Sequence, residues 1–315
     1  MTAVDMSPVS PIRPTAAYGL GFGLAAVAMW AAYLSFARAG VTAGLKPQDF
    51  ILMRFGVAGL IMLPWLARHG MRTLGGIGWA RGAALAAAAG PLFIALGVGG
   101  YVFAPLAHGA VLQPTAVTLG TMAAAWLLFG ERPPRERALG VAIILTGLIL
   151  IAAGKGGAAG AGAWKGDILF VAAGLSWAAF TILLRRWRVG AMTATAAVAV
   201  ISALVVIPAF ATFGTFARIA GLSWPMLVTQ VIVQGVLSGV VAVIAYGKAV
   251  ELLGAARAAL FPALVPAAAL IVGLPVTGEV PSLTEAIGAA AATVGLAVAM
   301  GAIRMPAGRR PSAPE

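Results

Sequence analysis

Long apolar runs separated by short polar connections make up most of the sequence. A run of about 20 apolar residues forms a helix long enough to cross the roughly 30 Å hydrocarbon core of a bilayer. The runs are solidly apolar and rich in Ala, Leu, Gly and Val, whereas the strands of a membrane barrel would alternate apolar and polar residues. We therefore predict ten membrane-spanning helices, at about residues 17–37, 49–67, 82–102, 106–129, 137–153, 167–185, 192–212, 226–247, 257–277 and 285–303.

The composition agrees with this pattern. Of the 315 residues, 61% are hydrophobic and 10% are charged, and the mean hydropathy is +1.00. A soluble domain is about half apolar and about a quarter charged. The predicted fold class is therefore an all-α polytopic membrane protein with ten transmembrane helices.

The formal net charge of +12 would fit a nucleic-acid partner. However, no basic stretch is interleaved with aromatic residues that could stack on bases, so we expect no nucleic acid as partner. Lys and Arg in the connections of a membrane protein instead record its orientation. The expected partners are the lipid bilayer and a small-molecule substrate, and the sequence leaves homodimer formation open.

Ten spans place both termini on the same side of the membrane. Of the 21 Lys and Arg residues, we assign fifteen to that side and one, Arg54, to the interior of a span. The remaining five lie on the opposite side: Arg38, Lys46, Lys155, Lys165 and Arg218. Basic residues accumulate in cytoplasmic connections, so both termini are predicted to be cytoplasmic. Abundant Arg and Ala are typical of a GC-rich bacterial genome, so we expect a multi-pass protein of the bacterial inner membrane.

One short sequence motif occurs twice, as LFGERPPRERALG at 128–140 and VTGEVPSLTEAIG at 276–288. A shift of 148 residues superposes the two copies, and a shift of 147 pairs Trp30 with Trp177 in similar surroundings. The chain therefore contains two copies of a five-helix unit. Five is odd, so the second unit enters the membrane from the opposite side, and such inverted repeats are typical of secondary transporters that work by alternating access.

The repeat predicts how the chain is divided. We expect a disordered tail at 1–15, a first repeat at 16–153 and a periplasmic linker at 154–166. A second repeat at 167–303 and a cytoplasmic tail at 304–315 follow.

The repeated motif is interpreted as the end of one helix and the start of the next. Gly130 and Gly278 can end the fourth and ninth helices. Glu131 and Glu279 are expected to cap the start of the helix that follows each of them, with substrate or proton binding as the alternative. Four further glycines are spaced seven apart on the fifth and tenth helices and predict close packing there, as scaffold or dimer contact. They are Gly140, Gly147, Gly288 and Gly295.

The stretches at 50–63, 116–151 and 248–299 resemble the EamA-type transporters of the drug/metabolite transporter superfamily. The resemblance extends over about residues 16–303 and implies ten helices, alternating access and export of amino acids or other small metabolites. Within the superfamily, an exporter of amino acids, including aromatic ones, is the nearest analogy. The family has a Pro about thirteen residues before the motif Glu; Pro266 fits, whereas the first half has Thr118 there.

Few polar residues lie inside the predicted spans, so each is a candidate for substrate binding. Arg54 could anchor a substrate carboxylate or could lock helices together. Gln230 and Gln234 lie four apart on one face of the eighth helix and could bind a zwitterion or join helices by hydrogen bonds. Gln113 and His108 form a similar stripe on the fourth helix, where His108 is either an interfacial residue or a proton relay.

Aromatic residues and prolines complete the candidate site. Trp30 and Trp177 lie near mid-helix, away from the membrane interface where Trp usually lies, so they could be cavity walls or simple packing. Three tyrosines are further candidates for the walls, namely Tyr33, Tyr101 and Tyr246. A proline inside a helix removes a hydrogen bond and frees a carbonyl that could receive an ammonium group. The predicted breaks or hinges are Pro114, Pro262 and Pro266.

The sequence also argues against other functions. We find no ATP-binding loop of the GxxxxGK[ST] type, no clustered metal ligands or catalytic groups and no sign of a cofactor, so we do not expect an enzyme. No Asp or Glu lies deep in a predicted span, which favours a facilitator or a weakly coupled carrier. The predicted function is a secondary transporter that exports amino acids or related amphipathic compounds. A permease for another metabolite or drug and, further away, a lipid-modifying enzyme are the alternatives.

Overall fold

The computed structural model describes residues 14–131, 135–153, 162–211, 215–253, 258 and 260–299. Regular structure in these segments is entirely helical. The predicted C-terminal tail, the predicted N-terminal tail up to residue 13 and residues 154–161 of the predicted linker lie outside the described residues.

The elements of the first half are α1 (Pro14–Thr42), α2 (Pro47–Arg68), η1 (Met71–Thr73), α3 (Trp79–Ala89), α4 (Pro91–Gly100), α5 (Leu106–Phe129) and α6 (Arg135–Ala153). Those of the second half are α7 (Ala163–Trp187), α8 (Ala191–Ala211), α9 (Thr215–Ala220), α10 (Trp224–Gln230), η2 (Val231–Val241), α11 (Ala242–Leu253), α13 (Leu260–Thr277) and α14 (Leu283–Ala299). Seven helical stretches in the described chain are long and apolar enough to cross a membrane, and three shorter apolar helices accompany them. The predicted all-α polytopic membrane fold is confirmed.

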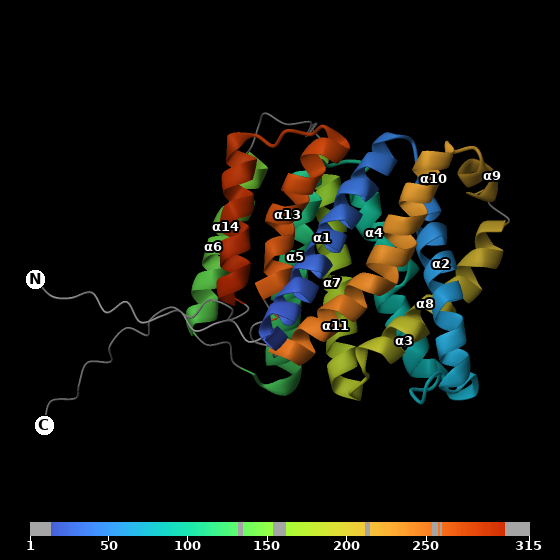
Figure 1. The fold of residues 1–315 in the computed structure, drawn as a ribbon. Helices are drawn as coiled ribbons and strands as arrows, with labels where there is room; N and C mark the ends of the chain where they lie inside the picture. The colour runs from blue at the N-terminus through green and yellow to red at the C-terminus, as the bar shows by residue number, and fades with distance from the viewer. Residues whose placement is uncertain are drawn as a thin grey trace, which may run out of the picture.

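The helices stand side by side and run alternately up and down (Figure 1). We call the end at which α1 begins and α14 ends the terminal end, and the opposite end the distal end. Connections at 43–46, 101–105, 221–223 and 278–282 lie at the distal end.

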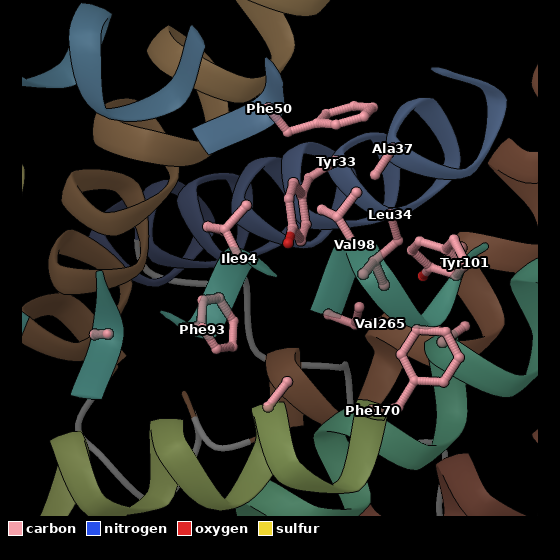
Figure 2. Close-up of a cluster of buried hydrophobic side chains, with 14 of the residues drawn as sticks. Tyr33, Leu34, Ala37, Phe50, Phe93, Ile94, Val98, Tyr101, Phe170 and Val265 are labelled. Carbon is pink, nitrogen blue, oxygen red and sulfur yellow. The ribbon is translucent and has the colours of Figure 1, made fainter. Parts of the chain in front are cut away.

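Aromatic and aliphatic side chains fill the centre of the bundle. Figure 2 shows Tyr33, Phe50 and Phe93 in one part of this core, and Tyr101 beside Phe170 in another. Many large apolar side chains point outward instead; examples are Leu127 (74% exposed) and Ile271 (70%). An outer surface of this kind suits lipid rather than water.

Helices α6 and α14 pack through the four predicted glycines. A Cβ added at Gly147 would lie 2.6 Å from the carbonyl oxygen of Gly288, and one at Gly140 would lie 2.8 Å from that of Gly295. Both glycines of α14 face α6 in return. No side chain fits at these positions, so the predicted close packing of the fifth and tenth helices is confirmed, and it occurs within one chain.

The third span departs from the prediction of one continuous helix. It consists of α3 and α4, which are separated at Gly90 and Pro91. Proline has no N–H to continue α3, but it suits the first turn of a new helix. The hydroxyl of Ser176 donates a hydrogen bond of 2.6 Å to the carbonyl of Ala88, which satisfies an acceptor beside the break.

The equivalent span of the second half is also irregular. Residues 231–241 form the π-helix η2 between α10 and α11. Wide turns of this kind are frequent at functional sites. The structure has no helix break at the three predicted prolines, all of which it describes. Helices α5 and α13 continue through Pro114 and Pro266, and Pro262 lies in the first turn of α13.

Candidate functional site

A cavity of about 100 Å³ lies among α2, α3, α7, α8, η2 and α11. Arg54 and Phe55 line it about two turns from the distal end of α2, and Ala89 lines it at the break between α3 and α4, in the middle of the third span. Leu184 and Ala191 line it close to the terminal ends of α7 and α8. The cavity therefore extends from the middle of the bundle toward the terminal end.

Arg54 contributes a positive charge to the cavity lining. Its Nη1 donates a hydrogen bond of 2.8 Å to the hydroxyl of Ser238 on η2, and its guanidinium carbon lies 5.1 Å from the ring centroid of Tyr33 on α1. Among the described residues, no carboxylate forms an ion pair with it. The guanidinium is thus held by neutral groups, and its charge remains uncompensated by a protein anion.

Trp177 lines the same cavity from α7. Its ring lies 4.8 Å from that of Phe93 and 5.1 Å from that of Phe180, measured between centroids. Trp30, its equivalent in the first repeat, packs against Tyr246 at 5.4 Å instead. Two residues paired by the repeat therefore have different surroundings, and only the one in the second half faces the cavity.

The remaining predicted binding residues do not line this cavity. Gln230 and Gln234 are fully buried; the amide of Gln230 donates a hydrogen bond of 2.8 Å to the carbonyl of Phe36, and Gln234 donates one of 3.2 Å to Gln230. Only the bond of Gln230, which joins α10 to α1, is the interhelical hydrogen bonding left open by the sequence, because Gln230 and Gln234 lie in one span. The others also lie elsewhere: Trp30, Tyr33, Tyr101, His108, Gln113 and Tyr246.

Sequence analysis missed Ser238, Phe180 and Thr195, which line the cavity or hold Arg54. Ser238 is one of few polar residues in its span, which was a usable signal. Phe180 and Thr195 could not be distinguished from ordinary packing residues by local pattern.

Comparison with known proteins settles the family. The EamA-like transporter family matches residues 17–153 and again residues 164–301, which together are most of the chain. The chain belongs to the EamA-like transporter family. Members of this family are transporters rather than enzymes, so the chain is a membrane transporter of small molecules.

Eleven chains of solved structures are similar to this EamA-like protein. One crystal structure, titled only as that of a protein, is 18% identical, with a TM-score of 0.54 over 90% of this chain and 96% of its own. At this identity the similarity concerns the fold alone. None of the curated proteins searched matches the chain.

The motif residue Glu279 has a partner that local spacing did not predict. One of its carboxylate oxygens pairs with Arg38 of α1 at 2.6 Å, and the other accepts a hydrogen bond of 2.9 Å from the backbone N–H of Leu106. Arg38 also donates to the carbonyl of Tyr101, at 2.5 Å. The prediction that Glu279 caps the next helix is wrong, because it caps α5 and holds α1 at the distal end.

The start of α14 is capped by its own residues. The backbone N–H of Ser282 donates to Oε2 of Glu285 at 2.7 Å, and the hydroxyl of Ser282 donates to the same oxygen at 2.8 Å. The N–H of Glu285 donates back to that hydroxyl at 3.3 Å. This reciprocal pair satisfies two of the free N–H groups at the helix start without Glu279.

Glu131, the equivalent of Glu279, lies at the terminal end. Its carboxylate pairs with Arg185 of α7 through two hydrogen bonds. Arg185 is the equivalent of Arg38 under the 147-residue shift. In this EamA-like transporter, each ion pair therefore joins the first helix of one half to the connection before the last helix of the other half.

Proposed function

We propose that this protein is a secondary transporter that exports small amphipathic metabolites bearing a carboxylate, foremost amino acids and including aromatic ones. The observation that carries the proposal is the charge of Arg54 in a cavity lined otherwise by apolar and aromatic side chains and the hydroxyl of Thr195. A carboxylate would supply the anion that the surrounding protein does not, and a guanidinium binds it through two parallel hydrogen bonds.

The cost of Arg54 supports a functional role. An Arg at mid-depth in a membrane costs about 2.5–3.5 kcal/mol by insertion measurements, so it persists where it has a partner or faces water. The hydroxyl of Ser238 and the ring of Tyr33 compensate part of this cost and fix the direction of the side chain. An arginine held in place in this way is preorganised for an incoming anion.

The size and lining of the cavity favour a small amphipathic substrate. Its volume of about 100 Å³ is well below that of sites for drug-sized ligands, which are roughly 300–1,000 Å³. Phe55, Trp177 and Phe180 offer apolar surface for a hydrophobic side chain. A free amino acid has both the carboxylate and the side chain that these groups suit.

Alternating access is the mechanism that the inverted repeat favours. The cavity extends toward the terminal end, while the pair of Arg38 and Glu279 joins the two halves at the distal end. With the termini in the cytoplasm of a bacterium, as the Lys and Arg count predicts, this conformation would load an export substrate from the cytoplasm.

Transport by purified protein in proteoliposomes tests the proposal. We expect flux of labelled phenylalanine and other neutral amino acids, and much slower flux of phenylalanine amide, which lacks the carboxylate. Arg54→Gln should lower flux of the acid by about 10- to 100-fold, which corresponds to a charge-assisted hydrogen bond of about 1.5–3 kcal/mol. The amide should be affected little.

A matched control is Arg81→Gln, because Arg81 is an exposed arginine of α3 that does not line the cavity. This variant should transport like the unchanged protein. Equal flux of acid and amide, or full activity of a folded Arg54→Gln variant, would rule out the carboxylate anchor. Flux of an unrelated drug or metabolite from the same panel would favour the alternative substrate class.

A further inference from the structure

His108 lies between two carboxylates at the distal end of the bundle. It is on the first turn of α5 and is only 4% exposed. Its Nδ1 lies 2.7 Å from Oδ1 of Asp167 on α7, and its Nε2 lies 4.0 Å from Oε1 of Glu285 on α14. Sequence analysis left His108 open as an interfacial residue or a proton relay and found no Asp or Glu deep in a predicted span.

The position of Glu285 is fixed by its neighbours. Its Oε2 accepts two hydrogen bonds from Ser282, as described above, so Oε1 is the oxygen turned toward the imidazole. Glu285 is 2% exposed, so little water reaches this carboxylate. Glu285 lies in the first turn of α14, so it is at the edge of a span and not deep within it, yet its carboxylate is buried.

The imidazole has room for one more proton. When Nδ1–H donates to Asp167, Nε2 of a neutral ring carries a lone pair, and this atom is buried without a hydrogen-bond partner. A buried polar atom without a partner is costly. A proton on Nε2 would create a donor directed at Glu285 and a positive charge between two negative ones.

We propose that His108, Asp167 and Glu285 form a proton-binding site that couples opening of the distal end to protonation. A proton from solution adds to Nε2 and converts the imidazole to an imidazolium. Asp167, whose side chain is 29% exposed, connects the site to solvent at this end. Histidine is suited to this task because it exchanges its proton between about pH 5 and pH 8.

The site joins the two repeats. His108 belongs to the first repeat, whereas Asp167 and Glu285 belong to the second. The imidazolium bridges α5 to both α7 and α14, so a bound proton stabilises the conformation in which the halves are closed at this end. Loss of the proton removes one bridge and favours opening, because a ligand shifts an equilibrium toward the state it binds better.

Other charged or titratable groups face α5 at this end. The carboxylate of Glu279 is paired with Arg38 and accepts a hydrogen bond from the N–H of Leu106, which lies two residues before His108. The hydroxyl of Tyr101 lies against Gly109, and the ammonium of Lys165 lies over the rings of Phe103 and Trp164. In the described chain, no group of three or more His, Cys, Asp and Glu side chains is placed to hold a metal ion.

The chain has only two histidines, His69 and His108, so proton binding can be observed directly. We suggest NMR of the full chain in nanodiscs with isotope-labelled histidine rings, with His69→Gln to assign the signals. The ring signals should show that Nε2 of His108 gains a proton as the pH is lowered. Glu285→Gln, which keeps an acceptor for Ser282, should weaken proton binding about tenfold, because a negative charge within about 4–6 Å favours the charged ring.

Coupling to the distal end is measured with a reporter cysteine. The chain has no cysteine, and Ser35 is buried on α1 one turn before Arg38. Labelling of Ser35→Cys by a maleimide should be slower at pH 6 than at pH 8 by on the order of tenfold, a typical coupling between sites. The same reporter in a His108→Gln chain corrects for thiol chemistry and should lack this extra dependence, whereas His69→Gln should keep it.

A ring of His108 that keeps one protonation state across the titrated pH range would overturn the proposal. So would a ratio of labelling rates at pH 8 and pH 6 that is as large in the folded His108→Gln chain as in the chain with His108. The role in transport rests on the proposed function, but neither readout needs a substrate. If amino acids are not transported but His108 still gains the second proton, the proposed substrate is refuted and the proton site is supported.

Discussion

The two ends of the bundle hold their charges differently. At the distal end, Arg38 and Glu279 are 12% and 21% exposed and bond to backbone groups as well as to each other. At the terminal end, the equivalent pair of Arg185 and Glu131 is 50% exposed on both sides. The two ion pairs occupy equivalent positions of the repeat, but in this conformation the distal pair is more buried than the terminal pair.

A second pair of interactions shows the same difference. Asp49 is fully buried at the distal end, where it pairs with Arg218 at 3.0 Å and accepts a hydrogen bond from the N–H of Lys46. At the terminal end, Lys248 and Glu251 pair at 2.6 Å while both are more than half exposed. Exposed pairs contribute little to stability, whereas removing one partner of a buried pair is costly. The structure is therefore held together at its distal end.

The largest expected effect comes from Asp49. Asp49→Asn should lower the free energy of unfolding by about 3 kcal/mol, at the low end for a buried pair because Arg218 is about one-third exposed. Glu251→Gln at the terminal end should leave stability unchanged within error. Thermal unfolding of both variants in the same detergent checks this, and equal losses would remove the difference between the ends.

A smaller effect is expected on the labelling of reporter cysteines when the equivalent glutamates Glu279 and Glu131 are each replaced. Glu279→Gln should speed labelling of the Ser35→Cys reporter about 10- to 100-fold, because a charge-assisted interaction of about 1.5–3 kcal/mol is lost. For the terminal end, Ile182 is the buried equivalent of Ser35, one turn before Arg185.

Glu131→Gln should change labelling of the Ile182→Cys reporter by less than about threefold, since its ion pair is exposed. Both reporters are measured in nanodiscs, where both ends are accessible. A similar increase at the two ends would mean that the ion pairs hold them equally.

The smallest effect is that of salt. Raising ionic strength from about 0.1 M to about 1 M shortens the Debye length from about 10 Å to about 3 Å and screens exposed charges far more than buried ones. Labelling at Ile182→Cys should rise slightly, by less than about threefold, and labelling at Ser35→Cys should not change. A larger salt effect at the distal end would show that its ion pair is open to solvent.

The spans could be predicted from sequence because each depends on local composition. The glycine contacts of α6 and α14 could be predicted because regular spacing places small residues on one helix face. The break at Gly90 and Pro91 has a local signal, a Gly-Pro pair inside an apolar run, but the length of the run alone predicts one continuous helix. The π-helix η2 has no comparable signal in its apolar residues.

The contacts of the charged residues could not be predicted in the same way. Glu279 bonds to Arg38 across 241 positions of the chain, and His108 bonds to Asp167 across 59. Spacing within one helix says nothing about such partners, because they depend on how the helices assemble. For the same reason, Arg54 and Ser238 could each be identified as a polar residue in an apolar span, whereas the hydrogen bond between them could not be predicted.

The glycine contacts between α6 and α14 have a mechanical consequence. These helices come from opposite repeats, and their backbones touch at two levels with no space for even a methyl group. Sliding one along the other would force backbone atoms together. In the alternating access proposed above, one repeat would therefore pivot against the other about this pair, and the displacement of each remaining helix would grow with its distance from that axis.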